Sequence, residues 1–222
     1  MGTITRTFAN NITTSGVFKP TAFNNASFDN VTSVPEVALP SGGSMVLLST
    51  QTASSSASIS FTSGIDSTYK EYMFIFNDIH PQTDGALFTF NLSTDGGSNY
   101  NVTKTTTAFR TYQYETNALN YELAYQTGSD LAQSSSYQSL GTSNLGADND
   151  QSFVGVFYLF NPSSTTYVKH FLSDVNLSTD DDRTVRAFVA GYGNTTSAIN
   201  AIDFKCNSGN IDAGTIQMFG IL

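Results

Sequence analysis

The chain has 222 residues, of which 39% are hydrophobic, 13% aromatic and only 12% charged. This length suits one sizeable domain, and the aromatic share indicates a real hydrophobic core. The net charge of −9, with nine scattered Lys and Arg residues, argues against binding of nucleic acid and of anionic membranes. No stretch reaches the roughly 20 apolar residues of a membrane span, so we expect no membrane insertion. The single cysteine, Cys206, excludes an intrachain disulfide and a zinc cluster.

The first 43 residues differ from the rest of the chain. Their large apolar residues stand singly among Asn, Thr and Ser, and no helical or strand period persists long enough to define a buried face. These large apolar residues recur at fairly even intervals, which would have no role in a solvated tail. Residues 1–43 are therefore predicted to be an extended arm that orders against a neighbouring subunit. A disordered tail is the alternative, and Ser41-Gly42-Gly43 is the expected hinge. The expected docking side chains are Phe8, Ile12, Phe18, Phe23 and Phe28.

Strand patterns begin at Met45 and continue to the end of the sequence. Ala57, Ile59 and Phe61 alternate with Ser and Thr, which is the period of a strand with one wet face. Residues 72–76 are a continuous apolar run, typical of a strand covered on both faces. Similar patterns follow at 88–92, 154–160, 167–175, 184–190, 199–204 and 215–222. About ten to twelve strands separated by turn residues predict that residues 44–222 form an all-β, antiparallel β-sandwich with a jelly-roll-like arrangement.

Two local sequences leave alternatives open. Residues 117–131 fit no strand pattern clearly, and a short helix there is one interpretation. The five residues Asn-Leu-Ser-Thr-Asp occur at both 91–95 and 176–180, each time after an aromatic-rich segment. We interpret them as similar turn chemistry at two strand ends, with a duplicated half-domain as the alternative.

Candidate catalytic and metal-binding residues are few. The two histidines, His80 and His170, lie far apart in the sequence, and no Gly-x-Ser-x-Gly nucleophile motif accompanies them. Asp148-Asn149-Asp150 and Asp180-Asp181-Asp182 supply oxygen ligands but lack the spacing of a calcium loop, so acidic turns are the favoured interpretation. We therefore expect no catalytic residue, no bound metal and no cofactor.

Tyrosines gather in the polar middle of the chain, beside Asn and Gln. Exposed aromatic rings can stack on sugar rings, although Tyr is also common at protein interfaces. The candidate glycan-binding residues are Tyr112, Tyr114, Tyr121 and Tyr125, with Tyr137 nearby in the sequence.

Several segments resemble structural proteins of marine tailed bacteriophages. The resemblance is carried by Met1 to Ile12, by Asn24-Asn25-Ala26-Ser27, by the Ser-rich stretch 54–66, by 69–76, by Ser93-Thr94-Asp95-Gly96-Gly97 and by the ending 214–221. It implies a component of the virion, either a capsid-decoration protein or a tail-associated protein. The first residues also lack the apolar region of a secretory signal peptide, as expected for a protein assembled in the host cytoplasm and released by lysis.

The sequence thus predicts a non-enzymatic virion structural protein on the particle exterior, decorating or cementing the capsid. Its expected partners are other virion proteins and further copies of itself in a homo-oligomer. The alternative is a tail-associated protein that binds a host receptor or surface glycan, and a glycan depolymerase is the less favoured enzyme interpretation.

Overall fold

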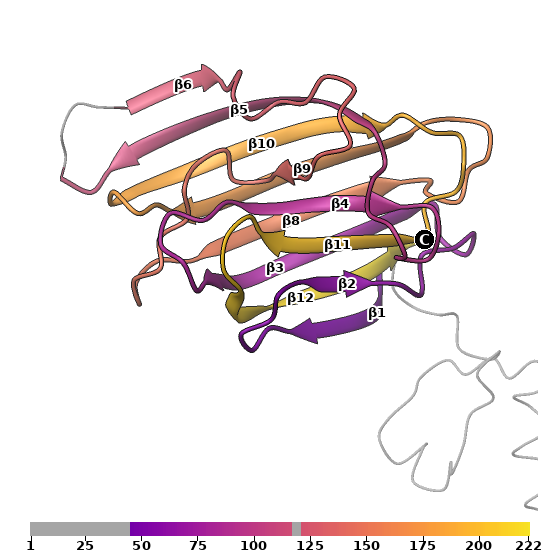
Figure 1. Ribbon diagram of the computed structural model, residues 1–222, viewed down its shortest axis with the longest axis horizontal. Coiled ribbons are helices and arrows are strands. Elements are labelled where there is room, and N and C mark those ends of the chain that lie inside the picture. Colours follow the sequence, from indigo (N-terminus) through magenta and orange to yellow (C-terminus); the bar gives the residue numbers. More distant parts are fainter. Residues whose placement is uncertain (1–44, 117–120) are drawn as a thin grey trace, which may run out of the picture. The chain divides into compact units, whose positions relative to one another are not determined.

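The computed structural model describes residues 45–116 and 121–222, and these residues contain strands but no helix (Figure 1). The predicted arm, with Phe8, Ile12, Phe18, Phe23 and Phe28, lies outside the described residues. The strands are β1 (Met45–Thr52), β2 (Ile59–Phe61), β3 (Glu71–Pro81), β4 (Phe88–Ser93), β5 (Lys104–Tyr114), β6 (Tyr121–Tyr125), β7 (Gln138–Ser139), β8 (Phe153–Phe160), β9 (Lys169–Ser178), β10 (Arg183–Gly193), β11 (Ala201–Cys206) and β12 (Ile211–Ile221).

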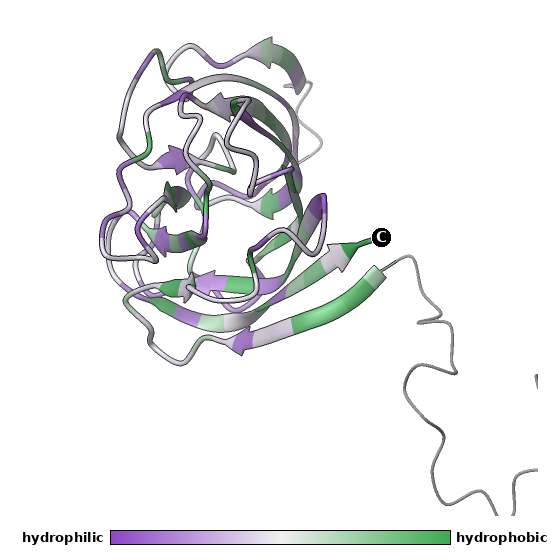
Figure 2. Cartoon of the chain, turned by 90° about the vertical axis from the view of Figure 1, so that its right-hand side faces the viewer, coloured by the Kyte–Doolittle hydropathy of each residue, from purple (hydrophilic) through white to green (hydrophobic). Residues whose placement is uncertain are grey.

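The strands form two antiparallel sheets of unequal size. The large sheet has eight strands in the order β1-β12-β3-β8-β9-β10-β5-β6, and the small sheet has four in the order β2-β11-β4-β7. The strands of the small sheet, β2, β4, β7 and β11, are separated in the sequence by strands of the large sheet. The chain therefore passes repeatedly between the two sheets (Figure 1). The predicted all-β antiparallel sandwich is confirmed. Buried and more exposed residues alternate along β5 and β9, and Figure 2 shows both apolar and polar residues on the strands.

The two sheets meet in an aromatic core centred on Phe204 of β11. Phe204 is completely buried, and its ring centroid lies 5.2 Å from that of Phe76 and 5.5 Å from that of Phe74. Four more rings lie within 6.5 Å, namely those of Phe61, Phe88, Phe90 and Phe157. Most of these pairs are edge-to-face or tilted, which is the favourable arrangement for aromatic quadrupoles and contributes about 0.5–1.5 kcal/mol per pair beyond burial.

Both Asn-Leu-Ser-Thr-Asp segments end a strand, β4 at Ser93 and β9 at Ser178, and they lie in different sheets. In the first, Asp95 accepts hydrogen bonds from the Ser93 hydroxyl and the Asn99 side chain. The Asn99 bond is the main reason that the pKa of Asp95 falls to about 2. Residues 121–125 form strand β6, so the helix considered for this region is absent from its described part.

Replacing Phe204 by Ala is expected to lower the free energy of unfolding by about 3–5 kcal/mol, because six rings lose their common neighbour and a cavity remains. Urea denaturation monitored by circular dichroism measures this loss. The control is Tyr167→Ala, at a side chain that is 71% exposed, with an expected change within about 0.5 kcal/mol. Equal effects of the two substitutions would contradict the central role of Phe204.

Candidate functional site

The outer face of the large sheet, which points away from the small sheet, carries exposed apolar side chains. Phe109 of β5 pairs with Phe188 of β10 on one side and with Tyr125 of β6 on the other. The Phe109 and Phe188 rings are stacked, with centroids 4.8 Å apart. Phe109 is 42% exposed and Leu172 of β9 is 49% exposed. We call Phe109, Tyr125, Leu172 and Phe188 the outer apolar face.

A shallow groove crosses this face over β9, β10 and β5. Its two adjoining hollows share Thr107, Leu172 and Ala190 as lining residues. Ala190 is small and pairs with both Thr107 and Leu172, so the sheet surface dips between larger neighbours. One end of the groove is lined by His170 and Tyr192, and the other by Phe109, Phe188 and Tyr158. The apolar walls and threonine hydroxyls suit binding of an apolar side chain or the face of a sugar ring.

One ion pair fixes the polar border of the groove. The Arg186 guanidinium binds Asp174 through two hydrogen bonds, of 3.0 Å and 2.7 Å, and lies 4.7 Å from the centroid of the Phe188 ring. Phe188 is therefore held between Phe109 and Arg186. These two contacts fix the orientation of the Phe188 ring on the outer face of the large sheet.

Strand β6 extends the outer apolar face to the edge of the sheet. Tyr121, Leu123 and Tyr125 are 72%, 76% and 51% exposed, and they alternate along β6 on the same side as Phe109. The Tyr125 hydroxyl donates a hydrogen bond of 2.6 Å to Asp130. Large exposed apolar residues on an edge strand are typical of a surface that contacts a partner.

The structure separates the four candidate glycan-binding tyrosines into two pairs. Tyr121 and Tyr125 lie on the outer face of the large sheet, whereas Tyr112 and Tyr114 lie on its other face. Tyr112 packs against the core, and its ring is 5.5 Å from the Arg110 guanidinium and 5.0 Å from that of Arg183. The four tyrosines therefore do not form one binding surface, and glycan binding remains a prediction for the outer pair.

Tyr137 is placed differently again. Its hydroxyl donates a 2.9 Å hydrogen bond to Asp203, and the Lys205 amine lies 4.0 Å from its ring centroid. Burial and the neighbouring Asp203 carboxylate raise the pKa of Tyr137 far above its usual range. Tyr137 is thus part of the packing over the small sheet.

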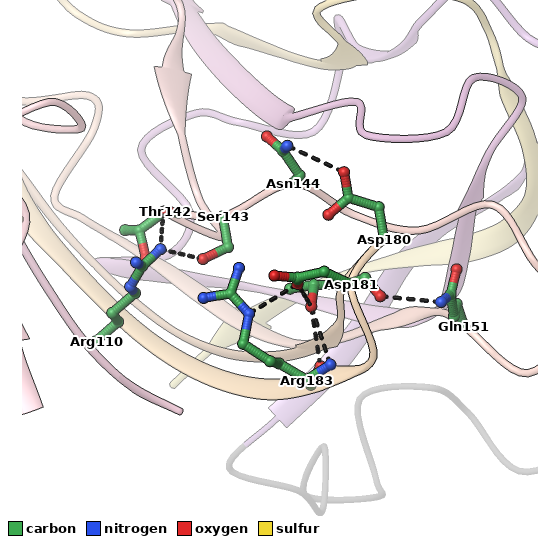
Figure 3. A network of polar contacts seen from close by, with 9 residues as sticks. Arg110, Thr142, Ser143, Asn144, Gln151, Asp180, Asp181 and Arg183 are labelled. Carbon is green, nitrogen blue, oxygen red and sulfur yellow. Dashed lines mark hydrogen bonds and ion pairs between the residues drawn. The ribbon is translucent and has the colours of Figure 1, made fainter. Parts of the chain in front are cut away.

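A group of polar contacts around Arg110 and Arg183 holds one end of the sandwich (Figure 3). Arg110 donates to the Thr142 carbonyl oxygen at 2.9 Å and to the Ser143 hydroxyl. Arg183 donates to Asp181 at 2.7 Å, and Asp181 also accepts from the Thr179 hydroxyl at 2.6 Å. These bonds lower the pKa of Asp181 even though burial alone would raise it. The acidic stretch at 180–182 therefore forms a turn held by hydrogen bonds.

The two histidines lie on different strands, and His80 borders the acidic stretch 148–150. His80 lies on β3 and contacts the Asp148 carbonyl oxygen at 3.2 Å, whereas His170 lies on β9 beside Tyr192. Within residues 45–116 and 121–222, no group of three or more His, Cys, Asp or Glu side chains is arranged to hold a metal ion. The same residues include no helix that is long and apolar enough to cross a membrane.

Comparison of the chain with protein-family models, curated proteins and solved structures gives no match.

Replacing Arg110 by Ala is expected to lower the free energy of unfolding by about 1.5–3 kcal/mol, because the Thr142 and Ser143 oxygens lose a charged donor. Arg186→Ala is the matched control, since its ion pair with Asp174 is more than one third exposed on both sides, and a loss of at most about 1 kcal/mol is expected. Thermal and urea unfolding of both variants make the comparison. A larger loss for Arg186→Ala would show that the network around Arg110 does not hold this end of the sandwich.

Proposed function

We propose that the chain is a non-enzymatic structural protein on the exterior of a bacteriophage particle, where it decorates or cements the capsid. The observation that carries the proposal is the outer apolar face. Isolated apolar side chains are normal on protein surfaces, but here Phe109, Leu172, Leu123 and Tyr125 lie on one face of one sheet. A capsid protein or a second copy of the chain would cover such a face.

The composition fits a particle-borne protein. Few charges and many hydroxyl and amide side chains give a surface rich in uncharged polar groups over an aromatic core. The single cysteine, Cys206, is buried, and burial raises its thiol pKa to about 11, which keeps it protonated and unreactive. Such a chain does not depend on disulfides, as expected for a protein that folds in a reducing cytoplasm.

A second candidate is a tail-associated protein that binds a host receptor or glycan. The observation that favours it is the groove itself, because aromatic walls beside the hydroxyls of Thr105 and Thr107 are suited to stacking on a sugar ring. Location on the particle separates the two candidates. Quantitative mass spectrometry of purified particles should find a copy number comparable with that of the major head protein if the chain decorates the capsid.

A low copy number, together with co-purification with isolated tails, would favour the tail candidate. Absence of the chain from purified particles would overturn both.

The same preparation can test the arm: deletion of residues 2–43 should leave a cooperative melt but abolish rebinding to particles that lack the protein. Undiminished rebinding would show that the arm does not dock.

Substituting Phe109 or Leu172 by Ser should weaken attachment to the particle about ten- to hundredfold, because a buried side chain of this kind contributes about 1.5–3 kcal/mol. Both side chains are partly exposed in the isolated chain, so the melting temperature should change little. Tyr167→Ser, in the loop before β9, is the control and should bind as the unaltered chain does. Equal binding by all variants would show that the outer apolar face is not the contact surface.

A further inference from the structure

Two lysines lie inside the sandwich, where lysine is rare. Lys104 begins β5 and Lys169 begins β9, and both pair with Gly193 of β10, so the three residues form one row across the large sheet. Both lysines are completely buried. The two ion pairs found within the described residues involve only arginines, so neither lysine has a carboxylate partner there.

The partners of the two amines differ. Lys169 Nζ donates to two backbone carbonyl oxygens, those of Tyr167 at 2.7 Å and Thr195 at 3.1 Å. Lys104 Nζ donates to the Val102 carbonyl oxygen at 2.9 Å and to the side-chain oxygen of Asn91 at 2.5 Å. Asn91, on β4 of the small sheet, is also completely buried. The Lys104 contact therefore joins an amine and a carboxamide from opposite sheets.

The contact brings the amine close to the carbon atom that amide formation would attack. Because Oδ1 is bonded to Cγ at about 1.23 Å, Nζ of Lys104 lies within about 3.7 Å of the Asn91 Cγ. This is close to the roughly 3–3.5 Å separation of groups poised to react. Asn91 cannot turn away easily, since its Nδ2 donates to the Tyr100 and Ser135 carbonyl oxygens at 2.6 Å and 3.0 Å.

The surroundings also favour the reactive forms of both groups. Burial lowers the pKa of Lys104 to about 7, so a substantial fraction of the amine is neutral near neutral pH and has a free electron pair. The backbone N–H of Leu92 donates to Asn91 Oδ1 at 2.9 Å. That donor would stabilise the negative charge that develops on Oδ1 when Cγ is attacked.

We propose that Lys104 and Asn91 condense to form an intramolecular isopeptide bond. Nζ of Lys104 attacks Cγ of Asn91, and the bond between Cγ and Nδ2 breaks. One proton passes from Nζ to Nδ2, and ammonia leaves. The product is a secondary amide between the two side chains, and no oxidant or cofactor takes part.

Asp203 is the residue to which we assign the proton transfer. It lies directly opposite Asn91 in the pairing of β11 with β4, and it is 3% exposed. Opposed residues in such a ladder have Cβ atoms about 4.5–5.5 Å apart. The Asp203 carboxylate accepts hydrogen bonds from Ser60 at 2.5 Å and Tyr137 at 2.9 Å, which hold it in position. Because Asp203 makes no ion pair with Lys104 within the described residues, it would take the proton from Nζ through one bridging water and return it by the same route to the departing nitrogen.

The decisive test is the mass of the full-length protein after denaturation. We expect a mass lower than that of the sequence by one ammonia. Trypsin should also fail to cleave after Lys104, which is the only lysine or arginine between Lys70 and Arg110. Fragmentation of the resulting looped peptide should place the bond between Asn91 and Lys104. A full sequence mass with normal cleavage after Lys104 would overturn the proposal.

Variants separate cross-linking from ordinary packing. Lys104→Met and Asn91→Ala should each give a protein whose mass equals that calculated from its own sequence, without loss of ammonia. Lys169→Met, at the other buried lysine, should keep the looped peptide. Asp203→Asn should lower the cross-linked fraction of freshly synthesised protein, and an unchanged fraction would refute its assigned role. Loss of the looped peptide in folded Lys169→Met protein would contradict the assignment to Lys104. These results do not depend on whether the chain is found on phage particles.

Discussion

The packing of aromatic rings around Phe204 is the contact on which the architecture depends. The small sheet has only four strands, two of them very short, so it must hold the large sheet through a few bulky side chains. Phe204 projects from β11 into rings that belong to β2, β3, β4 and β8. Because this cluster occupies the inner face of the large sheet, the opposite face is free to carry Phe109 and Leu172 toward solvent. The candidate contact surface thus follows from how the core is built.

Polar groups inside the sandwich are satisfied mainly by neutral partners. Thr106 donates to Gln138 at 2.7 Å, and Lys169 relies on backbone carbonyl oxygens alone. The chain has 18 acidic residues against nine Lys and Arg residues, yet neither buried lysine pairs with a carboxylate within the described residues. The Asn91 carboxamide beside Lys104 is therefore both a hydrogen-bond acceptor for that amine and its proposed reaction partner.

The sequence predicts the sandwich well because its signals are local. The alternation around Ile59 and Phe61 becomes β2, and the apolar run at 72–76 lies within β3. The candidate binding residues were harder to predict, because strand register decides which tyrosines share a face. Tyr121 pairs with Gln113, so it lies on the face opposite to Tyr112. In the sequence, Lys104 and Lys169 have the appearance of ordinary surface charges. Only the strand pairing shows that both lie beside Gly193.

The pairing of β1 with β12 determines how the fold would respond to force. Met45 lies opposite Ile221, so the start of the described chain and its last strand meet at the same corner of the large sheet. Tension applied between Met45 and Ile221 would separate β1 from β12 one hydrogen bond at a time, because the load acts in the direction of the hydrogen bonds. Tension applied along the strands would have to break many hydrogen bonds together. The molecule is thus mechanically weak to tension across the β1–β12 ladder and strong to tension along its strands.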